Sequence, residues 1–341
     1  MNPEPCELHH EPHETGNRRL HSKPTVTPSN AAQDARPRLI VICGPTAVGK
    51  TGVGIAVAGA LKGEVISADS MQVYRGMDIG TAKPTAAERA AVPHHLIDVV
   101  APDEPFDAAH FTRLARPLVR ALHAAGTVPV VVGGTGLYLK ALLSGLFDAA
   151  PVDPEVRRRL AAEAQAAGVP ALHARLGEVD PATAARLHPN DRVRILRALE
   201  VHASTGRPLS ALQREHRFRD APFAALKIGL TLERGALYER IDRRVDVMVA
   251  DGLEAEVRGL MARGYDPGLK SMQSIGYSHM AALVAGTVDR AECLRTLKRD
   301  TRRFAKRQMT WFRADPGIAW LDPGRVDEVL RRAAAFLAGG S

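Results

Sequence analysis

Cysteine is scarce in this chain, and long apolar runs are absent. The 341 residues include three cysteines, Cys6, Cys43 and Cys293, which are widely spaced and form no C-x-x-C pair. This spacing argues against a disulfide framework or a cysteine zinc site and favours a reducing cytoplasm. No uninterrupted apolar stretch approaches the length that crosses a membrane. The sequence therefore predicts a cytoplasmic globular protein, and it shows no internal repeat.

Apolar clustering is also missing from residues 1–36, which are rich in Pro, His, Glu, Asn and Ser. Such a segment buries too little surface to offset the entropy of ordering, so we predict a disordered N-terminal tail. The tail has no apolar signal-peptide core, and its glutamates argue against a transit peptide.

The formal net charge is +8. A basic balance favours a polyanionic partner such as a nucleic acid, although an Arg-rich composition alone can produce the same charge.

A phosphate-binding motif stands at residues 44–51, after an apolar run at 39–43 and before a helix-compatible stretch. It matches G-x-x-x-x-G-K-[ST] and consists of Gly44, Pro45, Thr46, Ala47, Val48, Gly49, Lys50 and Thr51. The glycines let backbone N–H groups point at one phosphate, the lysine adds a charge, and the threonine offers a hydroxyl to magnesium. The motif indicates that the chain binds a polyphosphate.

Short apolar runs alternate with amphipathic stretches from residue 37 onward, which predicts an α/β protein with a parallel sheet and crossover helices. We expect strands at 38–43, 64–68, 95–99, 128–132, 225–232 and 318–320, and helices at 51–61, 111–125, 234–263, 289–311 and 326–337. Composition shifts near residue 151 to Ala, Arg, Leu and Glu with helical spacing. We therefore predict a P-loop core at 37–150, an all-helical insertion at 151–223, and the rest of the core with a basic helix at 224–341.

Two further segments follow predicted strands and should meet the P-loop at one edge of the sheet. Asp69 ends the second strand, where it could bind magnesium, accept a proton, or simply cap a helix. It opens a long loop at 69–84, a length that is usually functional. Thr135 lies in the glycine loop 133–136, which by itself is weak evidence.

Basic side chains gather on a helical segment near the C-terminus, at three- and four-residue spacing for several of them. They are Arg295, Lys298, Arg299, Arg302, Arg303, Lys306, Arg307 and Arg313. Arg192, Arg194 and Arg197 form a second cluster in the insertion. Two clusters and a positive net charge favour a nucleic-acid surface over an ordinary solvated face. Among Arg240, Arg243 and Arg244, one turned inward could balance a pyrophosphate.

Together these stretches resemble the bacterial tRNA dimethylallyltransferase family, also called tRNA isopentenyltransferases. The resemblance rests on residues 44–51, 69–84, 132–138, 190–201, 271–277 and 306–313, in the family's order. The segment Asp-Ser-Met-Gln-Val-Tyr, which begins at Asp69, is the most specific of them.

The resemblance implies transfer of a dimethylallyl group from dimethylallyl diphosphate to the exocyclic N6 amine of the adenine 3′-adjacent to the anticodon. It assigns diphosphate binding to residues 44–51 and catalytic roles to Asp69, Thr46 and Arg244. Thr51 would bind Mg²⁺, the implied cofactor. The implied tRNA-binding residues are Asp69, Ser70, Met71, Gln72, Thr135, Arg157, Val193, Arg194, Ile195, Leu196 and Arg197. Val193 stands where the family usually has Gln.

Two alternatives share part of this pattern. A small-molecule or nucleoside kinase would have the P-loop and strand-end Asp but would not need the basic helix. A nucleic-acid-binding NTPase would show further motor motifs, which the sequence lacks. Whether ATP also binds stays open, and nothing demands an oligomer, so we predict a monomer.

Overall fold

The computed structural model describes residues 36–145, 153–216 and 220–339. The predicted tail at 1–36 lies outside these ranges, apart from Arg36. The described strands are β1 Arg38–Cys43, β2 Gly63–Ser67, β3 His94–His95, β4 Val128–Gly133, β5 Ala224–Leu230 and β6 Ile318–Leu321. The helices are α1 Lys50–Ala60, α2 Ala86–Ala91, α3 Ala108–Ala124, α4 Gly136–Ser144, α5 Pro154–Ala166, α6 Val169–Val179, α7 Pro181–Ala184, α8 Arg192–Thr205, α9 Leu209–His216, α10 Arg234–Ala250, α11 Leu253–Ala262, α12 Tyr277–Val284, α13 Arg290–Arg313 and α14 Val326–Leu337.

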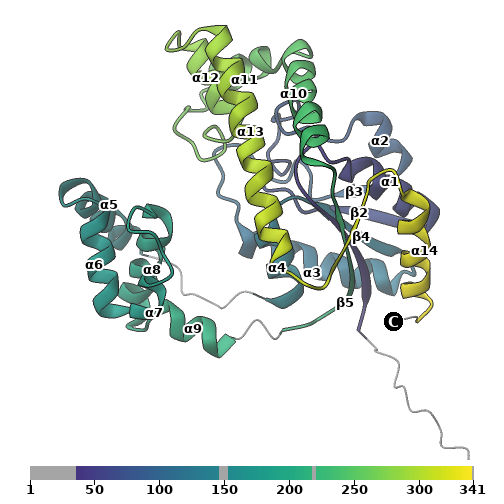
Figure 1. The fold of residues 1–341 in the computed structure, drawn as a ribbon, viewed down its shortest axis with the longest axis horizontal. Helices are drawn as coiled ribbons and strands as arrows, with labels where there is room; N and C mark the ends of the chain where they lie inside the picture. The colour runs from purple at the N-terminus through teal and green to yellow at the C-terminus, as the bar shows by residue number, and fades with distance from the viewer. Residues whose placement is uncertain (1–35, 146–152, 217–219, 340–341) are drawn as a thin grey trace, which may run out of the picture. The chain divides into compact units, whose positions relative to one another are not determined.

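All six strands form one parallel sheet in the order β3-β2-β4-β1-β5-β6 (Figure 1). The P-loop strand β1 is central, where Val41 is level with Val131 of β4 and Lys227 of β5. The predicted fold class, a parallel sheet with flanking helices, is confirmed.

Side chains of β1 alternate between the two faces of the sheet because successive residues of a strand point to opposite sides. Leu39, Val41 and Cys43 belong to the core cluster that includes buried residues of α3 and α4. Ile40 and Ile42 belong to the cluster shared with α1 and α14. The strand is thus buried on both faces, as expected for the centre of a parallel sheet.

Two elements differ from the sequence-based expectation. The strand expected at 95–99 is only His94–His95, because Leu96 (φ 61°) and Asp98 (φ 58°) adopt left-handed backbone conformations that turn the chain out of the sheet. The helix expected at 234–263 is two helices, α10 and α11, since Gly252 interrupts it with φ 101°.

Residues 153–216 contain five helices and, within this described range, no strand. Helices α5 to α8 surround a separate core cluster that includes Leu160, Leu172, Leu176, Ile195 and Leu199. This segment therefore has its own hydrophobic interior.

Candidate active site

The P-loop joins β1 to α1 in a conformation that most residues avoid. Gly44 has φ 140°, and a Cβ there would lie 2.6 Å from the Leu230 carbonyl oxygen, so only glycine fits. Ala47 is left-handed (φ 62°), which is backbone strain of the kind found at ligand sites. Gly49 precedes α1 without a side-chain cap. The N–H groups of the first turn of α1 are therefore left to bind an anion.

Lys50 supplies the positive charge of the loop. Its ammonium group donates a hydrogen bond to the Pro45 carbonyl oxygen at 2.7 Å. Burial lowers the pKa of Lys50 to about 8; the charge of Asp69 opposes this change and that of Arg244 reinforces it. These electrostatic interactions bring together residues from β1–α1, β2 and α10. Among the described residues, no carboxylate forms an ion pair with this ammonium group, and a bound diphosphate would supply a counter-charge.

Two arginines of α10 face this loop. Burial and the neighbouring Arg240 lower the pKa of the Arg244 guanidinium. A guanidinium nitrogen of Arg240 lies 3.5 Å from the point that a Cβ would occupy if residue 49 were not glycine. In the part of the chain that the structure describes, neither guanidinium forms an ion pair with a carboxylate. Arg243 between them is exposed. The sequence offered Arg240, Arg243 and Arg244 as candidates and the family resemblance selected Arg244 alone, whereas the structure also brings Arg240, at i,i+4 spacing from Arg244, to the loop.

Asp69 follows β2 and uses one carboxylate oxygen to hold its own loop. Oδ1 accepts hydrogen bonds from the backbone N–H groups of Met71 at 2.8 Å and Gln72 at 3.4 Å. No hydrogen bond to Oδ2 is found among the described residues. No described helix begins at this point, so Asp69 stabilises a turn and does not cap a helix, and one of its oxygens remains able to accept a proton.

The second glycine loop packs directly against the Asp69 loop. Thr135 Oγ1 accepts from the Ser70 backbone N–H at 3.0 Å. A Cβ at Gly133 would lie 2.1 Å from the Ala68 carbonyl oxygen, so this close approach requires glycine. As the sheet topology predicted, the ends of β2 and β4 meet beside the P-loop.

Gln308 of α13 connects the two glycine loops, and its role was not foreseen from sequence. Its Oε1 accepts from the Thr46 backbone N–H at 2.8 Å, and its Nε2 donates to the Gly134 carbonyl at 2.9 Å. The residue is 8% exposed. Because the Thr46 N–H already donates to Gln308, Thr46 has only its side-chain hydroxyl for contact with a ligand.

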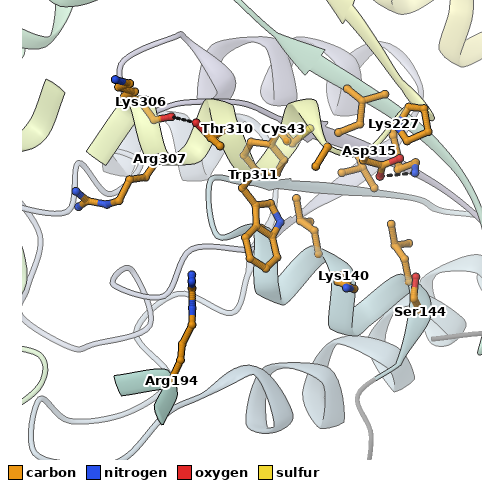
Figure 2. A pocket seen from close by; sticks show the side chains of 18 residues that line it. Cys43, Lys140, Ser144, Arg194, Lys227, Lys306, Arg307, Thr310, Trp311 and Asp315 are labelled. Carbon is orange, nitrogen blue, oxygen red and sulfur yellow. Dashed lines mark hydrogen bonds and ion pairs between the residues drawn. The ribbon is translucent and has the colours of Figure 1, made fainter. Parts of the chain in front are cut away.

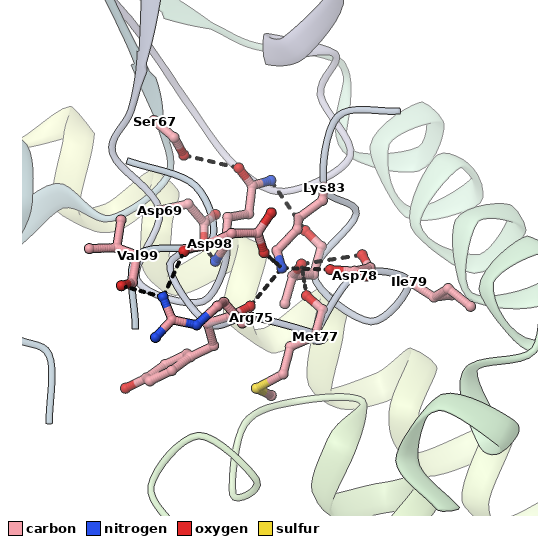
Figure 3. Close-up of polar contacts among 12 residues, drawn as sticks. Ser67, Asp69, Arg75, Met77, Asp78, Ile79, Lys83, Asp98 and Val99 are labelled. Carbon is pink, nitrogen blue, oxygen red and sulfur yellow. Dashed lines mark hydrogen bonds and ion pairs between the residues drawn. The ribbon is translucent and has the colours of Figure 1, made fainter. Parts of the chain in front are cut away.

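A buried lysine organises the loop 69–84 (Figure 3). Lys83 Nζ donates to the Tyr74 carbonyl at 2.6 Å, to Asp78 Oδ1 at 2.6 Å and to Asp98 Oδ1 at 2.5 Å. Gln72 points into the same loop, where its amide donates to the carbonyls of residues 81 and 82. Its side chain therefore acts inside the protein, which does not favour the predicted contact with tRNA.

The motif at 271–277 supports this loop from outside. The Tyr277 hydroxyl donates to Glu256 Oε1 at 2.6 Å, and a Cβ at Gly80 would lie 2.5 Å from the tyrosine ring. Glu256 also accepts from the backbone N–H groups of residues 78, 79 and 80. Burial, followed by the charge of Glu256, raises the pKa of Tyr277, so the hydroxyl remains a donor.

Predicted RNA-contact residues of the insertion divide into outward and inward groups. Val193 is 78% exposed, and Arg194 and Arg197 are also exposed or half-buried. Ile195 is fully buried in the helical core, so its side chain is closed to an RNA partner. Arg157 of α5 holds the buried Glu200 of α8 at 2.9 Å. Part of the 193–197 segment therefore serves the insertion itself.

A cavity of about 910 Å³ opens beside these loops (Figure 2). Its lining includes Cys43 at the end of β1, Gly136 after Thr135, and Trp311 of α13, with Arg194 of α8 at its edge. Burial raises the pKa of the Cys43 thiol to about 12, so the thiol stays neutral.

The residues present fit a hard divalent cation bound together with a phosphate ligand. Thr51 stands in the first turn of α1, and its hydroxyl has no hydrogen bond recorded within the described ranges. Threonine hydroxyl and carboxylate oxygens are donors that Mg²⁺ prefers, and it commonly takes few protein ligands. No group of three or more His, Cys, Asp or Glu side chains that could hold a metal occurs among the described residues.

The parallel sheet, the strand–loop–helix phosphate motif and the strand-end carboxylate define an α/β protein of the P-loop class. Residues 72–315 match the family described as IPP transferase. The chain belongs to this family.

Members of the family in other organisms resemble this chain in both sequence and structure. A tRNA dimethylallyltransferase of Syntrophobacter fumaroxidans is 58% identical over 294 residues, which is 86% of each chain. The crystal structure of a tRNA isopentenylpyrophosphate transferase from Bacillus halodurans is 44% identical, with a TM-score of 0.66 over 88% of this chain and 96% of that one. A eukaryotic dimethylallyltransferase structure, described as acting on tRNA, is 29% identical, with a TM-score of 0.78 over 89% and 80% of the two chains. Within the described residues, no helix has the length and apolarity to span a membrane.

Proposed function

We propose that this protein transfers a dimethylallyl group from dimethylallyl diphosphate to the N6 amine of the adenine 3′-adjacent to the tRNA anticodon. The convergence of the P-loop, Asp69 and the Thr135 loop at one sheet edge carries the proposal. In this proposal the P-loop holds the diphosphate, and the Asp69 carboxylate beside it has one oxygen free to act on the second substrate. The names of the family's curated relatives supply the substrate class.

The diphosphate is the leaving group. The bond between C1 of the dimethylallyl group and the bridging oxygen breaks, and its electron pair leaves with the diphosphate. Lys50, Arg244 and Arg240 together stabilise the negative charge that develops on the diphosphate. The Thr46 hydroxyl donates a hydrogen bond to this diphosphate. Mg²⁺, bound by Thr51 and the diphosphate, would further neutralise that charge.

The adenine amine is the nucleophile. Its nitrogen forms the new bond to C1, and the free oxygen of Asp69 accepts the proton that the amine loses. The adenine must leave the base stack to reach this point. Thr135 lies beside Ser70 and would contact the RNA there. Helix α13 and the exposed residues of the helical insertion would bind the anticodon stem-loop.

The free, buried thiols Cys43 and Cys293 suit a reducing compartment, and tRNA is present in the cytoplasm, so we assign the enzyme to the cytoplasm. All the proposed groups come from one chain, and we propose that it acts as a monomer.

The test is incubation with labelled dimethylallyl diphosphate, unmodified tRNA and magnesium. We expect label in the tRNA, and none in a matched tRNA whose target adenine is replaced by guanine. Consumption of ATP with phosphorylation of another acceptor, and no label in tRNA, would instead support the kinase alternative.

A further inference from the structure

Trp311 is an exposed aromatic side chain beside the candidate site. It lies in the last turn of α13 and is 44% exposed. A Cβ at Gly136 would lie 2.1 Å from the indole ring, so the ring covers the backbone immediately after Thr135. The next residue, Leu137, is 46% exposed. An indole that is partly in solvent at this position can contact a ligand next to the proposed RNA contact.

The indole forms one wall of the cavity in Figure 2. Large apolar lining residues from the sheet, α4 and the end of α13 form the other walls: Val41, Leu139, Leu143, Phe312 and Ile318. The cavity of about 910 Å³ is within the usual size range of ligand pockets and has room for a nucleobase.

Cations surround this apolar interior. Lys306 and Arg307 line the cavity and are exposed; neither forms an ion pair with a carboxylate in the described part of the chain. Arg307 instead lies over the Phe304 ring. Asp315, the one acid among the described lining residues, is paired with Lys227 at 2.5 Å. The cavity therefore combines an aromatic face with uncompensated positive charge at its border.

We propose that this cavity binds an unpaired nucleotide of the RNA substrate, next to the adenine that enters at Asp69. The base stacks on Trp311, and its phosphate is held by Lys306 and Arg307. This inference rests on the proposed function, because it takes tRNA as the substrate. Stacking on an aromatic face with flanking cations is how proteins hold unpaired nucleotides. A purely hydrocarbon ligand would gain nothing from the two cations. Gly136 follows Thr135 by one chain step of about 3.8 Å, so the cavity begins where the target nucleotide would be bound.

Fluorescence provides a direct test, because the chain has only two tryptophans. In a Trp320→Phe background, Trp311 is the sole tryptophan. We expect an anticodon stem-loop RNA to quench its emission, and one particular abasic substitution among the unpaired loop positions to remove the quenching. Equal quenching by every abasic RNA, or none by RNAs that are retained on a filter, would overturn the proposal. So would quenching by dimethylallyl diphosphate alone, which would assign the cavity to the prenyl donor.

Affinity measurements give a second readout. Alanine substitution at a stacking position weakens binding by roughly 5- to 150-fold, from about 1–3 kcal/mol per base. We expect Trp311→Ala to raise the KM for RNA by this amount, Trp311→Phe to restore most of the loss, and Trp320→Phe to leave affinity unchanged. Pyrophosphate affinity should be the same in all variants. Normal RNA affinity in Trp311→Ala, with transfer intact, would refute the nucleotide site but not the proposed function. Failure of the wild-type protein to label any tRNA would refute the proposed function.

Discussion

The two oxygens of the Asp69 carboxylate have different surroundings, and this difference makes a conservative substitution informative. Oδ1 is held by backbone N–H groups, an interaction that an asparagine oxygen can also make. The second oxygen has the basicity that only a carboxylate provides. Substitution by asparagine therefore separates loop structure from proton transfer.

We predict that Asp69→Asn lowers the transfer rate by about 10²- to 10⁴-fold, the usual contribution of a general base. Retention of tRNA on a filter should be unchanged. The control is Asp103→Asn, an exposed acid in another loop. Transfer at the wild-type rate by Asp69→Asn would show that another group removes the proton.

Gln308 is the clearest positioning residue, because each end of its amide holds a different loop. In Gln308→Glu the acceptor for Thr46 remains, but a carboxylate oxygen faces the Gly134 carbonyl and repels it. A shift of about 1 Å at such loops can cost about 10²-fold in rate. We therefore predict a lower kcat and a higher KM for dimethylallyl diphosphate, with a smaller rise in the KM for RNA through the loop that carries Thr135.

Gln273→Glu is the matched control, since it makes the same change at an exposed glutamine that donates to the Pro267 carbonyl. Equal changes in both KM values would mean that Gln308 merely stabilises the fold.

At the scale of the element, α13 uses its basic residues in two ways. Lys298 and Arg302 pair with Asp246 and Asp242 of α10, each at 2.6 Å. Arg303, Lys306 and Arg307 are exposed. The sequence showed the three- and four-residue spacing but not this division, because the positions of the acids of α10 depend on how the two helices pack.

We predict that Arg303→Glu weakens tRNA binding and lowers the slope of log affinity against log salt by about 1, since one phosphate contact is lost. Arg331→Glu on α14 changes net charge equally and should leave both quantities unaltered. An identical salt slope in the two variants would show that Arg303 does not contact a phosphate of the RNA. The measurement is filter binding across a salt series.

The loop 69–84 depends on an element far away in sequence. Glu256 of α11 accepts three backbone N–H groups of this loop, and a glutamine there would turn one acceptor into a donor. We predict that Glu256→Gln speeds hydrogen exchange at residues 78–80 and slows transfer. Glu254→Gln, on the same helix but paired with Arg258 and Arg290, should affect neither. Unaltered exchange in Glu256→Gln would contradict this support role.

At the scale of the whole molecule, the helical insertion has a core separate from that of the sheet. Asp180 stabilises it by accepting from the backbone N–H groups of Thr183 at 3.0 Å and Ser210 at 2.9 Å. Burial opposes ionisation of Asp180, but these hydrogen bonds outweigh it and lower the pKa.

We predict that Asp180→Ala destabilises the insertion by about 1–3 kcal/mol, the cost of leaving buried donors unpaired. Pyrophosphate binding at the P-loop should persist, and the exposed Glu178→Gln is the control. Because the pKa in the folded protein is the lower one, the stabilisation is present above the ordinary aspartate range near 4 and is lost as pH falls below it. Thermal unfolding at several pH values measures both effects. A simultaneous loss of pyrophosphate binding would show that the two parts unfold together.

The sequence by itself determined the parallel sheet, the P-loop and the position of Asp69 at a strand end. These are local properties: apolar runs form buried strands, glycines permit the loop, and a parallel sheet brings its strand ends to one edge. The prediction of a strand at 95–99 was wrong, because residues in the left-handed conformation override the apolar pattern. Only the tertiary structure decided that Gln308 joins the two glycine loops, that Arg240 accompanies Arg244, and that Trp311 covers Gly136. Each depends on where α10 and α13 pack against the sheet, and that placement comes from contacts between residues more than a hundred positions apart.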